Sequence, residues 1–396
     1  MPARSEPLFW PRTHRDPKDP FNPAAEFARI RSEQPVFSVQ RRLPNGRFLT
    51  MWLITKYADA RELLSSRDTS NSFGRSESVA AQPGFLLSLD PPEHTRIRHM
   101  LTGQFSMRRL TAMRPHIEEI ATKFLDEMES AGPPVDLMDA FARPLPSLVI
   151  CELLGVPFEH QAEFQRRSDT MLDVSVTPGQ QAQNTQEMNA YMQSLVSMHR
   201  QTPGDDILGM LIRDHADELT EEELLGIGNI LLFAGHETTS NTIGLATLLL
   251  LQRPDQLALV RDDPDVIGSA VEEILRYLTI VHTGKPRIIL KDMIIGGQLI
   301  PVGDVAIVSL PSANRDAEFI ADPNVFGVTR QPQAHLTFGH GIHQCLGQQL
   351  ARLELSVALP ALLQRFPSLA LAASLGDLSF RGNGPVNGVR QLPVRW

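Results

Sequence analysis

Apolar side chains recur at three- and four-residue spacing through most of the chain between residues 56 and 282. This is the period of a helix that buries one face, so the segment is predicted to be mainly helical. The clearest periods predict helices over Lys56–Ser66, Pro91–Phe105, Met107–Glu129 and Met138–Leu154. Residues 69–88 and 173–185 lack such a period, and we expect loops there.

The longest predicted helix extends from about Glu221 to Gln252. Thr220 precedes it and Glu223 follows three residues later, an arrangement in which two side chains cap the first turn reciprocally. Pro254 is expected to stop it. At about 1.5 Å per residue the helix would span roughly 48 Å, enough to cross the whole molecule.

Short β-type runs predict a smaller β portion. Residues 36–54 should form a hairpin with its turn at Pro44-Asn45-Gly46. The remaining elements are expected to be strands over 286–310, a helix over 346–366 and strands over 369–396. The sequence has no internal repeat and no low-complexity linker, so residues 1–396 are expected to form a single domain that is mainly α with a smaller β portion.

Composition excludes several classes of protein. Lys and Arg total 37 and Asp and Glu total 46, a net charge of −9 that argues against a nucleic-acid binder. The longest apolar stretch, near Ile243–Leu251, is well short of the about 20 residues that cross a membrane. Residues 1–23 are polar and Pro-rich, which predicts an irregular arm and no signal peptide. Two cysteines make no disulfide framework, so we expect a cytoplasmic protein. We also expect a monomer.

The two cysteines lie in different surroundings. Cys151 lies in the apolar run 148–156 and is expected to be a core residue. Cys345 lies in Phe338–Gly347, where glycines permit positive φ and close backbone approach. A helical run follows from Gln348, so unpaired N–H groups and the helix dipole should lower the pKa of this thiol. Cys345 is therefore a candidate metal ligand.

The sequence of this loop resembles the cysteine-ligand loop of the cytochrome P-450 haem-thiolate monooxygenases, F-x-x-G-x-H-x-C-x-G, as found in soluble bacterial members. The resemblance implies the fold of that family, a prism-like single domain with a long central helix over the haem. It also implies haem b with Cys345 as the axial ligand of the iron. Phe338, Gly339 and Gly347 would lie against the haem.

A second resemblance lies midway along the long helix. Ala234-Gly235-His236-Glu237-Thr238 is similar to the A-G-x-[DE]-T segment of the same family. A Thr hydroxyl can bond a carbonyl one turn back and bend the helix, and a local widening would leave room for O₂. The resemblance implies that Glu237 supplies protons, that Thr238 assists O₂ activation and that Ala234 and Gly235 contact the haem.

A third set of residues is implied to hold the cysteine loop in place. Glu273 and Arg276 are three apart on a predicted helix, so they share a face, and they resemble the E-x-x-R pair of the family. Arg330 resembles the Arg that completes this buried cluster.

Cations are expected for the two haem propionates. His94 and Arg98 are four apart on a helix that Asp90 is expected to cap, and they resemble the H-x-x-x-R clamp of the family. Arg287 and His343 match two further propionate contacts. Arginine binds carboxylates well because its fork can donate two parallel hydrogen bonds.

The substrate pocket implied by the resemblance is mostly apolar. Its candidate lining residues are Phe85, Leu86, Ile230, Phe233, Ala234, Thr283 and Val386. His282 and Asn387 are polar candidates nearby, for which loop packing is the alternative role. Such a lining favours a hydrophobic small molecule, such as a polyketide, a terpenoid or a steroid-like compound, and the resemblance implies its hydroxylation or epoxidation.

Electrons for O₂ activation must come from another protein, because two cysteines cannot hold an iron–sulfur cluster through four thiolates and no flavin motif is present. The resemblance implies a ferredoxin and a ferredoxin reductase. Several basic residues follow or lie within the predicted helix of His94: Arg96, His99, Arg108, Arg109 and Arg114. They could form a basic patch that binds an acidic ferredoxin, or they could be an ordinary solvated surface.

Three alternatives remain open. A peroxide-driven peroxygenase of the same fold would not need the Glu237–Thr238 pair. A non-catalytic haem sensor would need neither that pair nor an electron partner. A zinc-dependent hydrolase would use nitrogen and sulfur ligands from His335, His340, His343 and Cys345, whose spacing is not a usual zinc pattern.

Overall fold

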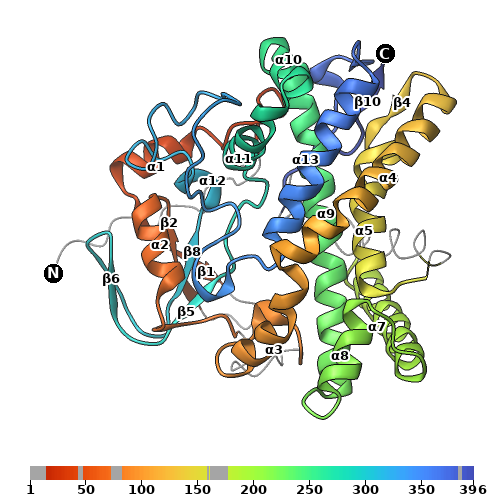
Figure 1. Ribbon diagram of the computed structural model, residues 1–396. Coiled ribbons are helices and arrows are strands. Elements are labelled where there is room, and N and C mark those ends of the chain that lie inside the picture. The colour runs from red at the N-terminus through yellow and green to blue at the C-terminus, as the bar shows by residue number, and fades with distance from the viewer. Residues whose placement is uncertain (1–14, 43–47, 73–82, 158–159, 161–176, 382–385) are drawn as a thin grey trace.

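The computed structural model describes residues 15–42, 48–72, 83–157, 160, 177–381 and 386–396 (Figure 1). Its helices are α1 Glu26–Glu33, α2 Tyr57–Ser65, α3 Glu93–Thr102, α4 Met107–Ala131, α5 Pro144–Leu154, α7 Pro178–Gln201, α8 Ile207–His215, α9 Glu221–Leu251, α10 Pro254–Asp262, α11 Ile267–Leu278, α12 Leu310–Ala313 and α13 Gln348–Arg365. In the described part of the chain, none of these is long and apolar enough to cross a membrane.

In the described part of the chain the strands form three small sheets, of which the largest lies to one side of the helical body (Figure 1). They are β1 Val36–Arg42, β2 Phe48–Ile54, β3 Thr69–Ser70, β4 Val135–Asp136, β5 Arg287–Ile289, β6 Met293–Ile295, β7 Gln298–Ile300, β8 Val305–Val308, β9 Ala370–Leu371 and β10 Pro393–Arg395. The largest sheet has the order β1-β2-β8-β5-β3, with β2 parallel to β8 and its other pairs antiparallel. The β4-β10-β9 sheet and the β6–β7 hairpin are separate.

Both faces of the largest sheet are covered, because alternate side chains of a strand point to opposite faces. Val36 and Ile54 are paired across β1 and β2 and pack with α2. Phe37 and Leu53, the next pair, pack with Phe27 of α1. The sheet is therefore clamped between two helices from the N-terminal part of the chain.

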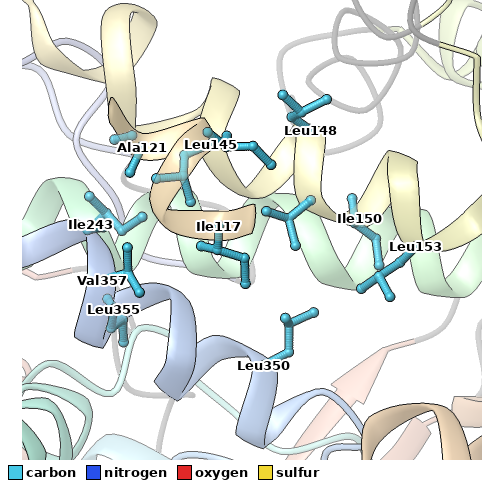
Figure 2. Close-up of a cluster of buried hydrophobic side chains, with 14 of the residues drawn as sticks. Ile117, Ala121, Leu145, Leu148, Ile150, Leu153, Ile243, Leu350, Leu355 and Val357 are labelled. Atoms are coloured by element: carbon cyan, nitrogen blue, oxygen red, sulfur yellow. The ribbon is translucent and has the colours of Figure 1, made fainter. Parts of the chain in front are cut away.

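The main core surrounds α9, the longest helix. α5, α7 and α13 all pack against it, and α4 packs against α13. Figure 2 shows the interdigitated side chains, among them Ile117, Ala121, Leu145, Leu148, Ile150, Leu153, Ile243, Leu350, Leu355 and Val357. Because α13 directly follows the loop of Cys345, this core fixes the loop relative to the middle of α9.

Several predicted elements are confirmed. The 36–54 hairpin forms with Val36 opposite Ile54, although its predicted turn lies outside the described residues. The reciprocal cap at the start of α9 is present, with Thr220 Oγ1 accepting from the Glu223 N–H and the Glu223 carboxylate accepting from the Thr220 N–H. The α9 helix ends before Pro254, which begins α10.

Three local predictions were wrong. The loop expected over 173–185 is helical from Pro178, because Thr177 and Gln180 cap α7 and its polar first turns hide the helical period. The helix expected from Met138 is a π-turn over Met138–Ala142 followed by α5, which begins at Pro144 because proline is favoured at the first position of a helix.

The third correction concerns Asp90, which does not cap α3 with its side chain. The carboxylate instead accepts hydrogen bonds from the N–H of Asn71 and the hydroxyl of Ser70. The backbone carbonyl of Asp90 still accepts from the N–H of His94.

Candidate functional site

The loop of Cys345 is a series of tight turns. The N–H of Cys345 donates to the carbonyl of Phe338 at 2.8 Å. Gly339 and Gly341 have φ of 72° and 76°, a region that L side chains rarely adopt. A Cβ on Gly341 would lie 2.4 Å from the carbonyl oxygen of Leu64, so the loop is pressed against α2. This backbone could not be formed by other residues without strain.

Protein surrounds the thiol of Cys345 on most sides, yet the side chain remains accessible to solvent. Burial raises its pKa, while the N–H of Gly347 and the charges of Arg98 and Arg352 oppose that rise. The expectation of a lowered pKa was therefore wrong, because the helix begins only at Gln348 and burial outweighs the favourable groups. Cys151, in contrast, is fully buried, and burial raises its pKa to about 12, as expected for a core cysteine.

The middle of α9 presents an accessible stretch in a helix that is otherwise largely buried. Ala234 is exposed, and Phe233 and Thr238 are half-buried. The Thr238 hydroxyl donates to the carbonyl of Ala234 at 2.9 Å, as expected from the sequence. The helix continues unbroken there, so the expected widening is not an interruption of the helix. A Cβ on Gly235 would lie 2.7 Å from a side-chain atom of Ile150, so this glycine allows α5 to pack closely.

Glu237 is buried and held by two donors that the sequence did not single out. Its Oε2 accepts from Asn241 Nδ2 at 3.0 Å and from Arg381 Nη1 at 3.2 Å. Asn241 lies one turn further along α9, a spacing that a search for polar side chains at i and i+4 would have found. Arg381 lies far away in sequence, so only the tertiary structure reveals it.

The residues expected to hold propionates come together. The imidazole rings of His94 and His343 lie 4.1 Å apart. Burial, with nearby cations, lowers the pKa of His94 to about 4 and that of His343 to about 3. Burial also lowers the pKa of Arg287 to about 10. Lys285, which the sequence did not single out, joins this group: burial and Arg287 lower its pKa to about 8.

This group fits the propionates of a haem. No described residue provides a hydrogen-bond partner for either ring nitrogen of His94, for Nε2 of His343 or for Nε of Arg287, although all are buried. Such polar atoms are costly to leave unpaired. The cations Lys285 and Arg287 share one carboxylate, that of Asp90, so this group carries a surplus of positive charge. Two carboxylates and an iron ion at the thiol would satisfy these groups.

The three residues expected to support the cysteine loop form one cluster. Arg276 donates to both carboxylate oxygens of Glu273 at 2.7 and 2.8 Å, and Arg330 Nε lies 3.4 Å from Glu273 Oε1. The two arginines also donate to backbone carbonyls between Asn314 and Val325. The cluster therefore fixes the irregular segment that leads into the cysteine loop.

The zinc alternative is not supported. Within the described residues, no group of three or more His, Cys, Asp or Glu side chains is arranged to hold a metal ion. His335 lies 3.3 Å from the carboxylate of Glu272, and His343 packs against His94. Glu272 also binds Arg352, whose guanidinium lies over the ring of Phe338 at 4.6 Å.

The substrate candidates come from separate segments of the chain. Leu86 and Ile230 are buried, whereas Phe85, Thr283 and Val386 are half-buried. Val386 forms an isolated β-bridge with Val281, which brings the C-terminal segment beside residue 283. Asn387 is buried and bonds the backbone at Ile280 and Pro20, so its role is loop packing. His282 is also buried.

The basic candidates have different partners. Arg96 binds Glu223 and the carbonyl of Glu218, and with His99 it lines a surface groove beside α8. Arg109 donates to the carbonyl of Asp205. Arg108 and Arg114 lie on α4, where Arg114 binds Glu118 and Ser356.

Comparison with known proteins agrees with this geometry. The family described as Cytochrome P450 matches residues 45–372. Cytochrome P450-SU2 of Streptomyces griseolus is 41% identical over 392 residues, covering 96% of either chain. A vitamin D3 dihydroxylase of the same organism is 41% identical over 357 residues, covering 87% of either chain. The crystal structure of CYP105P1 in complex with filipin I has a TM-score of 0.89 at 39% identity, covering 95% of this chain and 96% of that one. The chain therefore belongs to the cytochrome P450 family of haem monooxygenases.

Proposed function

We propose that this P450 carries haem b on Cys345 and inserts one atom of O₂ into a hydrophobic natural product, with electrons from a ferredoxin and its reductase. The observation that carries the proposal is the accessible Cys345 thiol together with the unpartnered nitrogens of His94, His343 and Arg287. Thiolate-bound haem supplies reductive activation of O₂ when it is bound.

The chain's own residues have distinct tasks in this proposal. Cys345 binds the iron through sulfur, and the tight turns at Gly339 and Gly341 keep that sulfur fixed. His94, Arg98, Arg287 and His343 bind the propionates, because two buried neutral imidazoles and two guanidinium groups are donors for carboxylate oxygens. Phe338 and the half-buried segment around Gly347 cover the sulfur.

Glu237 and Thr238 move protons. Glu237 is buried beside the accessible part of α9, so it can take up a proton from the solvent side and pass it toward Thr238. The small side chain of Ala234 leaves room beside the accessible part of α9. The presence of both residues favours an O₂-dependent oxygenase over a peroxide-driven enzyme.

A bulky, weakly polar substrate is favoured by the lining. Phe233 and Val386, both half-buried, supply apolar surface, and burial of such surface drives binding of apolar ligands. A relative bears the name vitamin D3 dihydroxylase, and a similar structure holds filipin I, which supports a steroid-like or polyketide substrate.

The electrons must come from a separate protein, because the two cysteines of this chain cannot hold an iron–sulfur cluster through four thiolates. A ferredoxin fits this role. We place the reaction in the cytoplasm, where reduced nicotinamide supplies the reductase, and we expect a monomer.

The reduced-plus-CO difference spectrum tests this proposal. The wild type is expected to show a strongly red-shifted Soret band, and Cys345→Ser is expected to lose it. Cys151→Ser is the matched control and should retain the band. A wild type that binds no haem, or whose CO band is not shifted, would contradict the proposal. Spectral titration with steroid-like and polyketide compounds then identifies the substrate class.

A further inference from the structure

The C-terminal hairpin reaches the middle of α9. Phe380 pairs with Val389, the N–H of Arg381 donates to the carbonyl of Gly388 at 2.8 Å, and the N–H of Arg390 donates to the carbonyl of Ser379 at 2.7 Å. A Cβ on Gly388 would lie 1.8 Å from Oδ1 of Asn241. The hairpin backbone therefore lies directly against α9, and this contact requires glycine.

The hairpin carries a charge into the site. Arg381 Nη1 lies 3.2 Å from Glu237 Oε2, and the two side chains are only 17% and 3% exposed. Asn241 Nδ2 donates to the same oxygen at 3.0 Å. Two donors on one oxygen define the rotation of the carboxylate, and a charge-assisted bond shielded from solvent is stronger than an exposed one.

The backbone partners of Arg381 make this contact rigid. Its own N–H is bonded within the hairpin, and Asn387 fixes the hairpin to Ile280 and Pro20. A guanidinium held in this way sets the position of the Glu237 carboxylate.

We propose that Arg381 is a positioning residue for proton delivery: it orients the Glu237 carboxylate so that protons pass from solvent toward Thr238. This proposal rests on the proposed function. The reaction consumes substrate, O₂, two electrons and two protons and yields hydroxylated product and water. Glu237 releases each proton and is protonated again from solvent, whereas Arg381 stays charged throughout and transfers none.

Two routes of turnover separate positioning from a structural role. When O₂ is reduced by electrons from a redox partner, the protein must deliver protons to the oxygen. When hydrogen peroxide is added instead, the two protons enter the site with the peroxide itself. Arg381→Gln is expected to lower O₂-dependent product formation about tenfold, below the 10²–10⁴ range for loss of a whole acid–base group. It should also raise the solvent isotope effect and the fraction of electrons lost as peroxide, and peroxide-driven turnover should stay within about twofold.

Arg381→Lys should recover most of the O₂-dependent rate, since it retains the charge. Arg390→Gln is the matched control, because Arg390 lies on the same hairpin with an exposed side chain. Equal losses in both routes, or no loss in either, would overturn the proposal. A wild type without the red-shifted CO band would overturn the proposed function as well, whereas a normal band with unaltered Arg381→Gln kinetics would overturn only this inference.

A second readout does not depend on turnover. Urea unfolding of the wild type, Arg381→Gln, Glu237→Gln and the double variant forms a double-mutant cycle. We expect the effects of the two substitutions on the unfolding equilibrium constant to be coupled by about tenfold, since buried charge pairs are not additive. Additive effects would show that the pair does not fix Glu237 and would contradict the proposal.

Discussion

The imidazole rings of His94 and His343 pack against each other at 4.1 Å, with their planes tilted by 49°. The rings come from α3 and from the cysteine loop, so the contact joins the two parts of the site. Burial lowers the pKa of both rings, to about 4 and about 3, so both are neutral at pH 7. Two neutral rings can pack together where two charged rings would repel.

This pair predicts a loss of stability in acid. The unfolded chain protonates both rings near the ordinary pKa of 6.5, whereas the haem-free folded chain does not until about pH 4. Stability should therefore fall as the pH decreases from about 6.5 to about 4, by up to about 1.4 kcal/mol per pH unit for each ring. Urea unfolding between pH 4.5 and 7.5 measures this, and His94→Gln should reduce the slope. The exposed His99→Gln should leave it unchanged. Bound haem should also reduce the slope, because its propionates favour the protonated rings.

Glu354 predicts the opposite dependence. It is fully buried on α13, and burial raises its pKa to about 8 despite a hydrogen bond with Thr239. The folded chain thus keeps a proton that the unfolded chain loses near pH 4.5. Its contribution to stability should fall as the pH rises from about 4.5 to about 8, at up to about 1.4 kcal/mol per pH unit. Glu354→Gln should remove this part of the slope in urea unfolding, and Glu127→Gln, at an exposed position, should not. An unchanged slope in Glu354→Gln would show that Glu354 ionises normally.

The Glu273 cluster should be essential for stability. Glu273→Ala leaves the buried guanidinium of Arg276 without its carboxylate, and breaking a buried pair costs about 3–5 kcal/mol. The exposed pairs of Arg365 with Asp126 and Glu129 offer a control, since such pairs contribute about 0–1 kcal/mol. Chemical unfolding of Glu273→Ala and Arg365→Ala compares the two directly. Similar costs for both variants would contradict the structural role of the cluster.

Gly341 should tolerate no side chain. Gly341→Ala would combine a positive φ with a Cβ 2.4 Å from the carbonyl of Leu64, and backbone strain of this kind costs about 1–3 kcal/mol before the clash is counted. The variant should lose haem faster, as measured by transfer to excess apomyoglobin. Gly268→Ala, within α11 and with no atom near its Cβ, should instead stabilise the protein by about 0.5–1 kcal/mol. Unchanged haem loss in Gly341→Ala would show that the turn is not needed.

The features that local sequence determines were predictable. The Thr220–Glu223 cap and the shared face of Glu273 and Arg276 need only neighbouring residues, and both are present. The turns around Cys345 followed from glycines. The sign of the shift in its pKa did not, because burial depends on elements distant in sequence.

Long-range contacts account for the other omissions. Arg381 approaches the site from a segment whose local sequence carries no motif, and only the packed chain brings it to Glu237. Lys285 lies only two residues before Arg287, but its burial beside that arginine depends on the surrounding elements. The start of α7 was missed because a mostly polar helix shows no apolar period, although Thr177 and Gln180 form a cap that the sequence contains.

The C-terminal hairpin has a practical consequence for protein engineering. Val386 lies on one arm, beside the candidate substrate segment, and Arg381 lies on the other arm, against the acid of the site. A library that varies residue 386 to accept a new compound is therefore expected to disturb Arg381 as well. With the proposed role of Arg381, selectivity and the efficient use of electrons would be linked traits. Screens that score product alone would select variants that waste reductant, so peroxide release should be scored with it.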